Sequence, residues 1–388
     1  MRPLDGVLVL ELGEGISAAY CTQILGDLGA DVIKIEPPSG DITRRLGPFP
    51  QDTPDREKSG LFLYLNRNKQ SLALDISCAT GQEIVRTLAK AANLVVENFE
   101  PGTLDRFGLS YDELAILNPG LVMTSITPFG QSGPYSHFKA SEIVLFAMGG
   151  LMTFIGDKKR EPLKMGGSPM LYMGGLFGFA STMTALHLAE ATNLGQHVDV
   201  SIMEGITASH AQDTLDYEYL GTVRTRGDLR TPIPCTDGFV SFAVQAHQYA
   251  DFQRLILGDE QTDADDVIER DRRRREGEMD LDILLWAAER SKVDAYREAQ
   301  QGHVPAAFMA DARDVLNSPQ LQSRGYFHEI SHPKAGTLSY AGLPARMTHA
   351  DLAYGPAPLL GQHTELLLKK YLQYSDGEID ELKAVGVI

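Results

Sequence analysis

The sequence of 388 residues has only three cysteines, Cys21, Cys78 and Cys235, and they lie far apart along the chain. Three scattered thiols form neither a disulfide framework nor a zinc site, so we expect buried, reduced thiols in a cytoplasmic protein. Long apolar runs are also lacking. No stretch approaches the roughly eighteen apolar residues of a membrane span, and the N-terminal residues reach Asp5 and Gly6 without a signal-peptide core. We therefore expect neither a membrane partner nor a bound metal.

Positive charge is scarce as well. Lys and Arg number 35 against 52 Asp and Glu, which gives a formal net charge of −17. Such a chain has no general attraction to nucleic acid or anionic lipid. It can bind an anionic ligand only where Lys, Arg and backbone N–H groups gather locally.

Strand-like and helical segments alternate along the first half of the chain. Residues 6–12 form an apolar run of strand length, a helical segment ends at Gly29, and residues 31–36 are strand-like again. The same order continues with strands predicted at 71–76, 94–96, 121–126 and 197–202, and helices at 80–92 and 171–191. Capping boxes are predicted at Thr80 with Glu83, Ser110 with Glu113, and Ser375 with Glu378. This alternation predicts an α/β fold with a parallel sheet covered on both faces.

Two later segments differ from this pattern. The predicted helix at 171–191 is rich in small residues, which would let another backbone approach closely. After Gly221 the composition shifts, and "TPIPCTDGFVSFAV" looks like the start of a small β-containing unit. The charge run 259–280 has mixed sign, which is typical of a solvated helix face and not of a nucleic-acid site.

The first turn matches a dinucleotide-binding fingerprint. "GEGISA", Gly13–Ala18, follows a predicted strand and precedes a helix, and Glu36 ends the next strand, where such folds place a ribose-binding acid. The same pattern is common in tight turns that let a helix pack on a strand, so both interpretations stay open on this motif alone.

Six further motifs occur in order along the chain. They are "LGADVIKIEPPSGDITR", "NRNKQSLALDI", "VVENFEPGTLDRFGLSYDEL", "NPGLVMTSITPFGQSGPY", "GQHVDVSIMEG" and "LLGQHTELLLKKYL". Together they resemble the family III CoA-transferases, a family that includes formyl-CoA and carnitine CoA-transferases and α-methylacyl-CoA racemases. Six ordered motifs are far more specific than one glycine-rich turn, so the resemblance displaces the nicotinamide interpretation.

The resemblance implies an architecture. Residues 1–220 and 331–388 would form a large Rossmann-like CoA-binding domain, and residues 221–330 a smaller α+β domain. The chain would be ring-shaped and would interlock with a second chain, so that each active site lies between two subunits. No cofactor would be bound permanently, because coenzyme A and its acyl thioester are substrates, together with a carboxylic acid.

The resemblance also assigns a CoA site. By motif match it would be lined by Asn68, Lys69, Asn98, Phe99, Arg106 and Lys139. These residue types suit the ligand, because phosphates need cationic or N–H donors and adenine needs a flat apolar contact. Glu100 departs from the pattern, since the family commonly has Arg there and a carboxylate would repel the CoA phosphates.

The family nucleophile is missing. Family members attack the acyl-CoA with an Asp carboxylate four residues before a helical Gly, and a carboxylate suits this step because its acyl derivatives are activated yet regenerable. Here that Gly matches Gly175, which places the Asp position at Leu171, or at Tyr172 if Pro169 sets the register. The racemase His position is Ser141, so racemase activity is not expected.

Two hypotheses follow from this loss. In the first, the chain is a non-catalytic subunit that pairs with a catalytic paralogue, as in heteromeric benzylsuccinate CoA-transferases, and CoA moves from a donor such as succinyl-CoA to a carboxylic acid. In the second, the chain is an active homodimer that uses a substitute nucleophile, with Tyr172, Glu142 and Ser168 as the candidates. The sequence does not identify the acceptor acid.

Overall fold

A computed structural model describes the whole chain except residues 1, 158, 225, 227–231 and 259–279. It divides into two compact units, Met1–Arg226 with Gly325–Ile388, and Gly227–Arg324. The prediction of a solvated helix face in the charge run 259–280 falls almost wholly outside the described residues.

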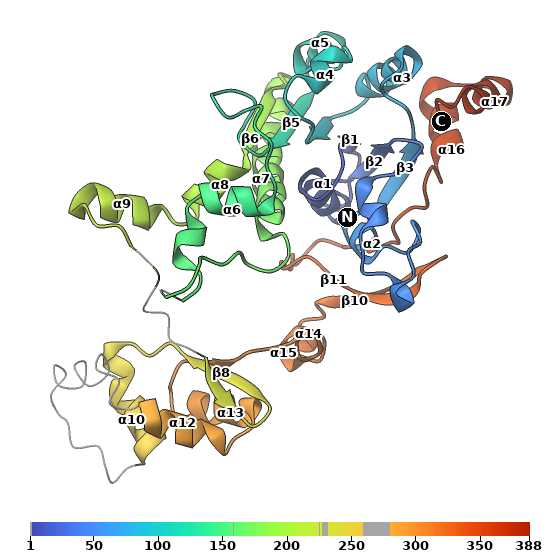
Figure 1. The fold of residues 1–388 in the computed structure, drawn as a ribbon. Helices are drawn as coiled ribbons and strands as arrows, with labels where there is room; N and C mark the ends of the chain where they lie inside the picture. The colour runs from blue at the N-terminus through green and yellow to red at the C-terminus, as the bar shows by residue number, and fades with distance from the viewer. Residues whose placement is uncertain (1, 158, 225, 227–231, 259–279) are drawn as a thin grey trace. The chain divides into compact units, whose positions relative to one another are not determined.

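The larger unit is built on a six-stranded parallel sheet in the order β3-β2-β1-β4-β5-β6 (Figure 1). Its strands are β1 (Leu8–Leu12), β2 (Asp31–Glu36), β3 (Lys69–Ala73), β4 (Leu94–Glu97), β5 (Val122–Thr127) and β6 (His197–Ser201). In the centre, Val9 of β1 lies opposite both Val32 and Leu94. The predicted parallel α/β sheet is confirmed.

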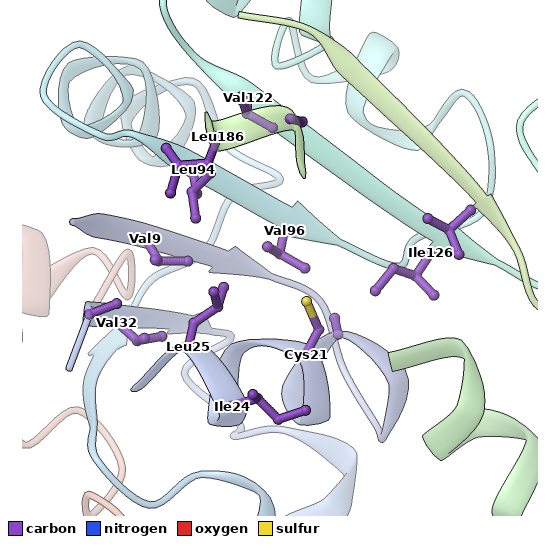
Figure 2. Packing of buried hydrophobic residues seen from close by; sticks show 14 of the residues in the cluster. Val9, Cys21, Ile24, Leu25, Val32, Leu94, Val96, Val122, Ile126 and Leu186 are labelled. Atoms are coloured by element: carbon purple, nitrogen blue, oxygen red, sulfur yellow. The ribbon is translucent and has the colours of Figure 1, made fainter. Parts of the chain in front are cut away.

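Helices cover both faces of this sheet. On one face, α1 (Ser17–Asp27) and α7 (Pro169–Thr192) pack on the strands through buried side chains such as Cys21, Leu25 and Leu186 (Figure 2). On the other face lie α3 (Ala79–Ala89), α5 (Tyr111–Leu117), α16 (Thr364–Leu367) and α17 (Asp376–Ala384). Because these last two helices share a core with the N-terminal strands, the two ends of the chain form one unit.

Close packing between α1 and α7 requires glycine. A Cβ at Gly175 would lie 2.6 Å from the Ser17 carbonyl oxygen, and one at Gly178 would lie 2.4 Å from Cδ1 of Ile126 on β5. Both distances are shorter than any relaxed contact. The prediction that the small residues of this helix allow close backbone approach is confirmed.

Two local predictions need correction. The strand predicted at 71–76 is observed at 69–73, because Lys69 enters the sheet with its ammonium group paired to a buried carboxylate. The cap predicted at Thr80 is wrong: Cys78 is the N-cap of α3, because a turn closed by the Asp75 carboxylate starts the helix earlier. The capping boxes at Ser110 and Ser375 are confirmed.

Shorter helices complete the larger unit. They are α2 (Gly60–Leu65), α4 (Thr103–Arg106), α6 (Glu142–Met148), α8 (Ile202–Ala208) and α9 (Ala211–Leu220). An antiparallel hairpin of β10 (Phe327–His332) and β11 (Gly336–Ala341) lies in the same unit. None of the helices in the described ranges is long and apolar enough to cross a bilayer.

The smaller unit has its own core. Its antiparallel sheet has the order β7-β8-β9, with β7 (Ile233–Cys235), β8 (Gly238–Phe242) and β9 (Ala306–Phe308). The helices described in this unit are α10 (Tyr249–Leu257), α12 (Asp280–Ala288), α13 (Lys292–Gln301), α14 (Ala312–Leu316) and α15 (Pro319–Ser323). The rings of Phe242, Phe252 and Trp286 pack at its centre with tilted planes.

Candidate functional site

The topology places a switch point between β1 and β4. From β1 the chain moves to β2 on one side, whereas β4 continues to β5 on the other, so the strand order reverses between them. Leu12 and Glu97 are paired at the carboxyl ends of these two strands. Open α/β sheets bind ligands at such a switch point, outside the carboxyl ends of the strands. The loops that begin at Gly13 and Asn98 therefore border the candidate site.

Asn98 ties these two loops together. Its side-chain oxygen accepts a hydrogen bond from the Glu14 N–H at 3.1 Å, and its amide donates to the Glu14 carbonyl at 2.7 Å and to the Ser17 hydroxyl at 3.1 Å. A Cβ at Gly13 would lie 2.2 Å from the same Asn98 oxygen. The glycine of the first turn thus makes room for the Asn98 side chain.

Lys69 lies inside the fold, beneath the first turn. Its ammonium group is fully buried and donates to Glu11 at 2.8 Å, to the Ala19 carbonyl and to Asn66. Burial lowers the pKa of Lys69 to about 8, although Glu11 favours its charged form. Burial alone would raise the pKa of Glu11, but Lys34 and Lys69 hold it at about 2. In this structure Lys69 neutralises a buried carboxylate and does not face solvent.

Asn68 also has structural partners. It adopts a left-handed backbone conformation, with φ of 61°, and its amide donates to the Asp27 carboxylate at 2.8 Å and to the Ala353 carbonyl at 3.0 Å. Its oxygen accepts from the Gly355 N–H. Asn68 therefore joins the C-terminal segment to the first helix.

The remaining predicted CoA residues are Phe99, Arg106 and Lys139. Phe99 is half-buried against the core beside α3 and α5. Arg106, at the end of α4, is exposed and donates to Thr103. Lys139 is 85% exposed and pairs with Glu100 at 2.7 Å. Glu100, which departs from the family pattern, thus forms an ion pair with the Lys139 ammonium group that was predicted to bind phosphate.

The start of α7 carries no reactive carboxylate. Leu171 is half-buried and packs against the core of the larger unit. Glu142 accepts hydrogen bonds from the N–H groups of Met170 at 2.9 Å and Leu171 at 3.3 Å, so it caps the helix. Ser168 occupies the N-cap position without a side-chain capping bond.

Tyr172 lies in an aromatic cluster at this point. Its ring meets Tyr20 edge-on at 4.9 Å between centroids, and Tyr64 lies 6.4 Å away. Burial raises the pKa of Tyr172, and the neighbouring Tyr20 raises it further. The phenol is therefore even less nucleophilic at neutral pH than a free tyrosine.

Glu36, the expected ribose ligand of the dinucleotide interpretation, is engaged elsewhere. Both of its carboxylate oxygens accept from the Arg44 guanidinium at 2.8 Å, and it also accepts from Ser71 at 2.7 Å. The side chain is buried. It presents no free acceptor to a ribose.

One feature of this region was not predicted. A cleft of about 150 Å³ lies between the sheet and helices α4 and α5. Glu97, Ser125 and His197 line it from three neighbouring strands. Its place before Asn98 in the "ENF" motif was the one feature of the sequence that pointed to Glu97. Its burial and its partners could not be predicted, because they depend on strands that are distant in sequence.

Comparisons with known proteins agree with this geometry. Residues 4–364 match the family described as CoA-transferase family III. A mouse protein named succinyl-CoA:glutarate CoA-transferase is 31% identical over 399 residues, covering 100% of this chain and 91% of the relative. The Thauera aromatica succinyl-CoA:(R)-benzylsuccinate CoA-transferase subunit BbsE is 30% identical, covering 95% and 94%. The crystal structure of a CAIB/BAIF family protein from Brucella suis is 29% identical, with a TM-score of 0.84 and coverage of 95% and 99%.

Proposed function

The chain belongs to CoA-transferase family III, and from this premise we propose that it is the non-catalytic subunit of a heteromeric enzyme. The enzyme would move CoA from a donor such as succinyl-CoA to a carboxylic acid. This chain would bind or enclose the thioester, and a paralogue would supply the nucleophilic Asp. The observation that carries the proposal is that neither Leu171 nor Tyr172, the two positions that the family register allows for the nucleophile, is a carboxylate.

The candidate substitutes do not repair this loss. Glu142 accepts two backbone N–H groups at a helix N-terminus, which stabilises its charge and reduces its tendency to attack a thioester. Tyr172 has a raised pKa, so very little phenolate exists at neutral pH. Ser168 has no described base in hydrogen-bond contact with its hydroxyl, which a serine nucleophile needs.

A partner chain is supported by the surface of α7. Leu176 and Leu188 are 52% and 50% exposed, and Phe177 is 40% exposed. Exposed apolar side chains on one long helix favour burial against another chain. The name of the BbsE relative describes a subunit, which agrees with a heteromer. We propose that the partner is a paralogue in an interlocked arrangement.

The test is activity with and without a paralogue. The chain is purified alone and co-purified with a family III paralogue that carries Asp at the Leu171 position, and CoA exchange between succinyl-CoA and candidate acids is measured. We expect exchange only from the mixed complex. Exchange at a normal rate by this chain alone would overturn the proposal in favour of the active homodimer.

Covalent trapping separates the two possibilities directly. Each preparation is incubated with succinyl-CoA and analysed by mass spectrometry, with and without hydroxylamine. We expect the adduct on the paralogue's Asp only. An adduct on Tyr172, Glu142 or Ser168 would identify a substitute nucleophile.

A further inference from the structure

Glu97 is the last residue of β4, and its side chain turns back onto the loop that it precedes. The carboxylate accepts the Phe99 N–H at 2.7 Å, and Ser125 of the neighbouring strand also donates to it. The residue is only 4% exposed. A buried carboxylate with two donors fixes the path of the backbone through Asn98 and Phe99.

The hydrogen bonds continue to the edge of the sheet. The Ser125 hydroxyl oxygen lies 2.8 Å from Nε2 of His197, the first residue of the edge strand β6. The His197 ring stacks on Tyr111 of α5, with centroids 5.6 Å apart and planes inclined by 14°. A Ser125 hydroxyl that donates its proton to Glu97 accepts from His197, and the imidazole proton then lies on Nε2.

The charges around Glu97 are mostly negative. The charges of Asp105 on α4 and Asp199 on β6 act on it, and the charge of Asp112 on α5 acts on His197. Glu100 also lines the cleft but is paired with Lys139. Burial raises the pKa of Glu97 to about 7, and the two aspartates raise it further by a smaller amount. The hydrogen bonds from Ser125 and the Phe99 N–H act in the opposite direction and lower it. Both protonation states are therefore populated near neutral pH.

We propose that Glu97 is a positioning residue whose ionised carboxylate holds the Asn98–Phe99 loop in its binding conformation, and that Ser125 links its protonation to the tautomer of His197. When Glu97 gains a proton, it donates to Ser125, Ser125 donates to Nε2, and the imidazole proton moves to Nδ1. The bond from Phe99 N–H then loses its charged acceptor and weakens. That this loop contacts CoA rests on the proposed function; the positioning itself does not.

The first measurement uses the protein without CoA. Amide hydrogen exchange at Phe99, corrected for the intrinsic pH effect, and the ¹⁵N shifts of His197 are recorded at pH 6 and pH 8. We expect protection of Phe99 to rise about tenfold at the higher pH, because hydrogen bonds to charged acceptors are stronger. The His197 proton should move from Nδ1 to Nε2 over the same interval.

The variant E97Q and its matched control D105N complete the test. Gln keeps an acceptor for Phe99 but cannot ionise, so E97Q should show the pH 6 pattern at both pH values. D105N removes one charge from the same cleft without a bond to the loop, so it should keep the wild-type switch. Equal behaviour of the two variants, or a wild type whose Phe99 protection and His197 tautomer ignore pH, would overturn the proposal.

CoA affinity is measured last, by calorimetry. At pH 8 we expect E97Q to bind CoA about tenfold more weakly than D105N, whereas at pH 6 the two should agree to within about twofold. If the wild type binds no CoA but Phe99 and His197 switch as described, the CoA assignment fails and the positioning role stands. If CoA binds but E97Q and D105N bind equally at pH 8, the positioning role fails.

Discussion

The loop after β4 and the start of α7 differ in what they retain of the family pattern. At the loop, Asn98 clamps the first turn and Glu97 holds the Phe99 backbone, so hydrogen bonds fix the loops at the switch point of the sheet. At the start of α7 the backbone geometry is equally well formed, with Glu142 capping the helix, but the position that we propose for the nucleophile is Leu171 and carries no carboxylate.

On the proposed function, this contrast would separate binding from chemistry in the fold. The crevice depends on many mutually supporting contacts around the switch point of the sheet. The nucleophile depends on one side chain. One substitution can therefore remove the reaction while leaving the fold and the binding loops in place.

The largest effect is expected from restoring the missing group. L171D should form a covalent adduct with succinyl-CoA, where the wild type forms none, because the surrounding turn is retained. L171N, which has the same size but no nucleophile, should form no adduct. The measurement is mass spectrometry of the intact protein, and an L171D protein that folds but stays unmodified would contradict the assignment of this position.

Disrupting the contact between the first turn and the loop after β4 should destabilise the protein. G13A places a Cβ 2.2 Å from the Asn98 oxygen, so the clamp between the two loops must open. Loss of those three hydrogen bonds, together with the steric clash, should lower the free energy of unfolding by about 2–3 kcal/mol, measured by urea denaturation. Gly15 also lies in the first turn, but no atom lies within 4 Å of the position that its Cβ would take. Because asparagine tolerates a positive φ, G15N is the control, and it should lower the free energy of unfolding by less than about 1 kcal/mol.

The buried Glu97 should make stability depend on pH. Its pKa is about 7 in the folded protein, above its ordinary value of 4.5, so its contribution to stability is complete below pH 4.5 and is lost as the pH rises through 7. E97Q should therefore gain about 2–3 kcal/mol over the wild type between pH 5 and pH 8. Thermal unfolding across this range measures it, and a constant difference would show that Glu97 does not titrate there.

The smallest effect concerns the exposed pair of Glu100 and Lys139. E100Q frees the ammonium group, so CoA affinity should rise about threefold at low ionic strength and return to the wild-type value at about 0.5 M salt, because exposed charges are screened. Calorimetry at two salt concentrations tests this. E100Q combined with K139Q should bind no better than the wild type.

The sequence was sufficient for the frame of the protein. Alternating apolar strands and helices predicted the parallel sheet, the capping boxes at Ser110 and Ser375 predicted two helix starts, and the small residues of α7 predicted close packing. These features are local or periodic, and such patterns can be recognised one segment at a time. The cap at Thr80 was predicted wrongly because a turn at Asp75, outside the pattern, moved the start of the helix.

By itself, then, the sequence determined the α/β fold and the family, and it placed an aliphatic residue at the proposed nucleophile position. Only the tertiary structure decided which polar groups are free. It buried Lys69 against Glu11, paired Lys139 with Glu100, and joined Glu97 to His197 through Ser125. Each of these partners comes from a different strand or loop. Their pairing depends on distance and burial in the folded chain, and residue type alone cannot distinguish a charge that meets a ligand from one that meets its own counter-charge.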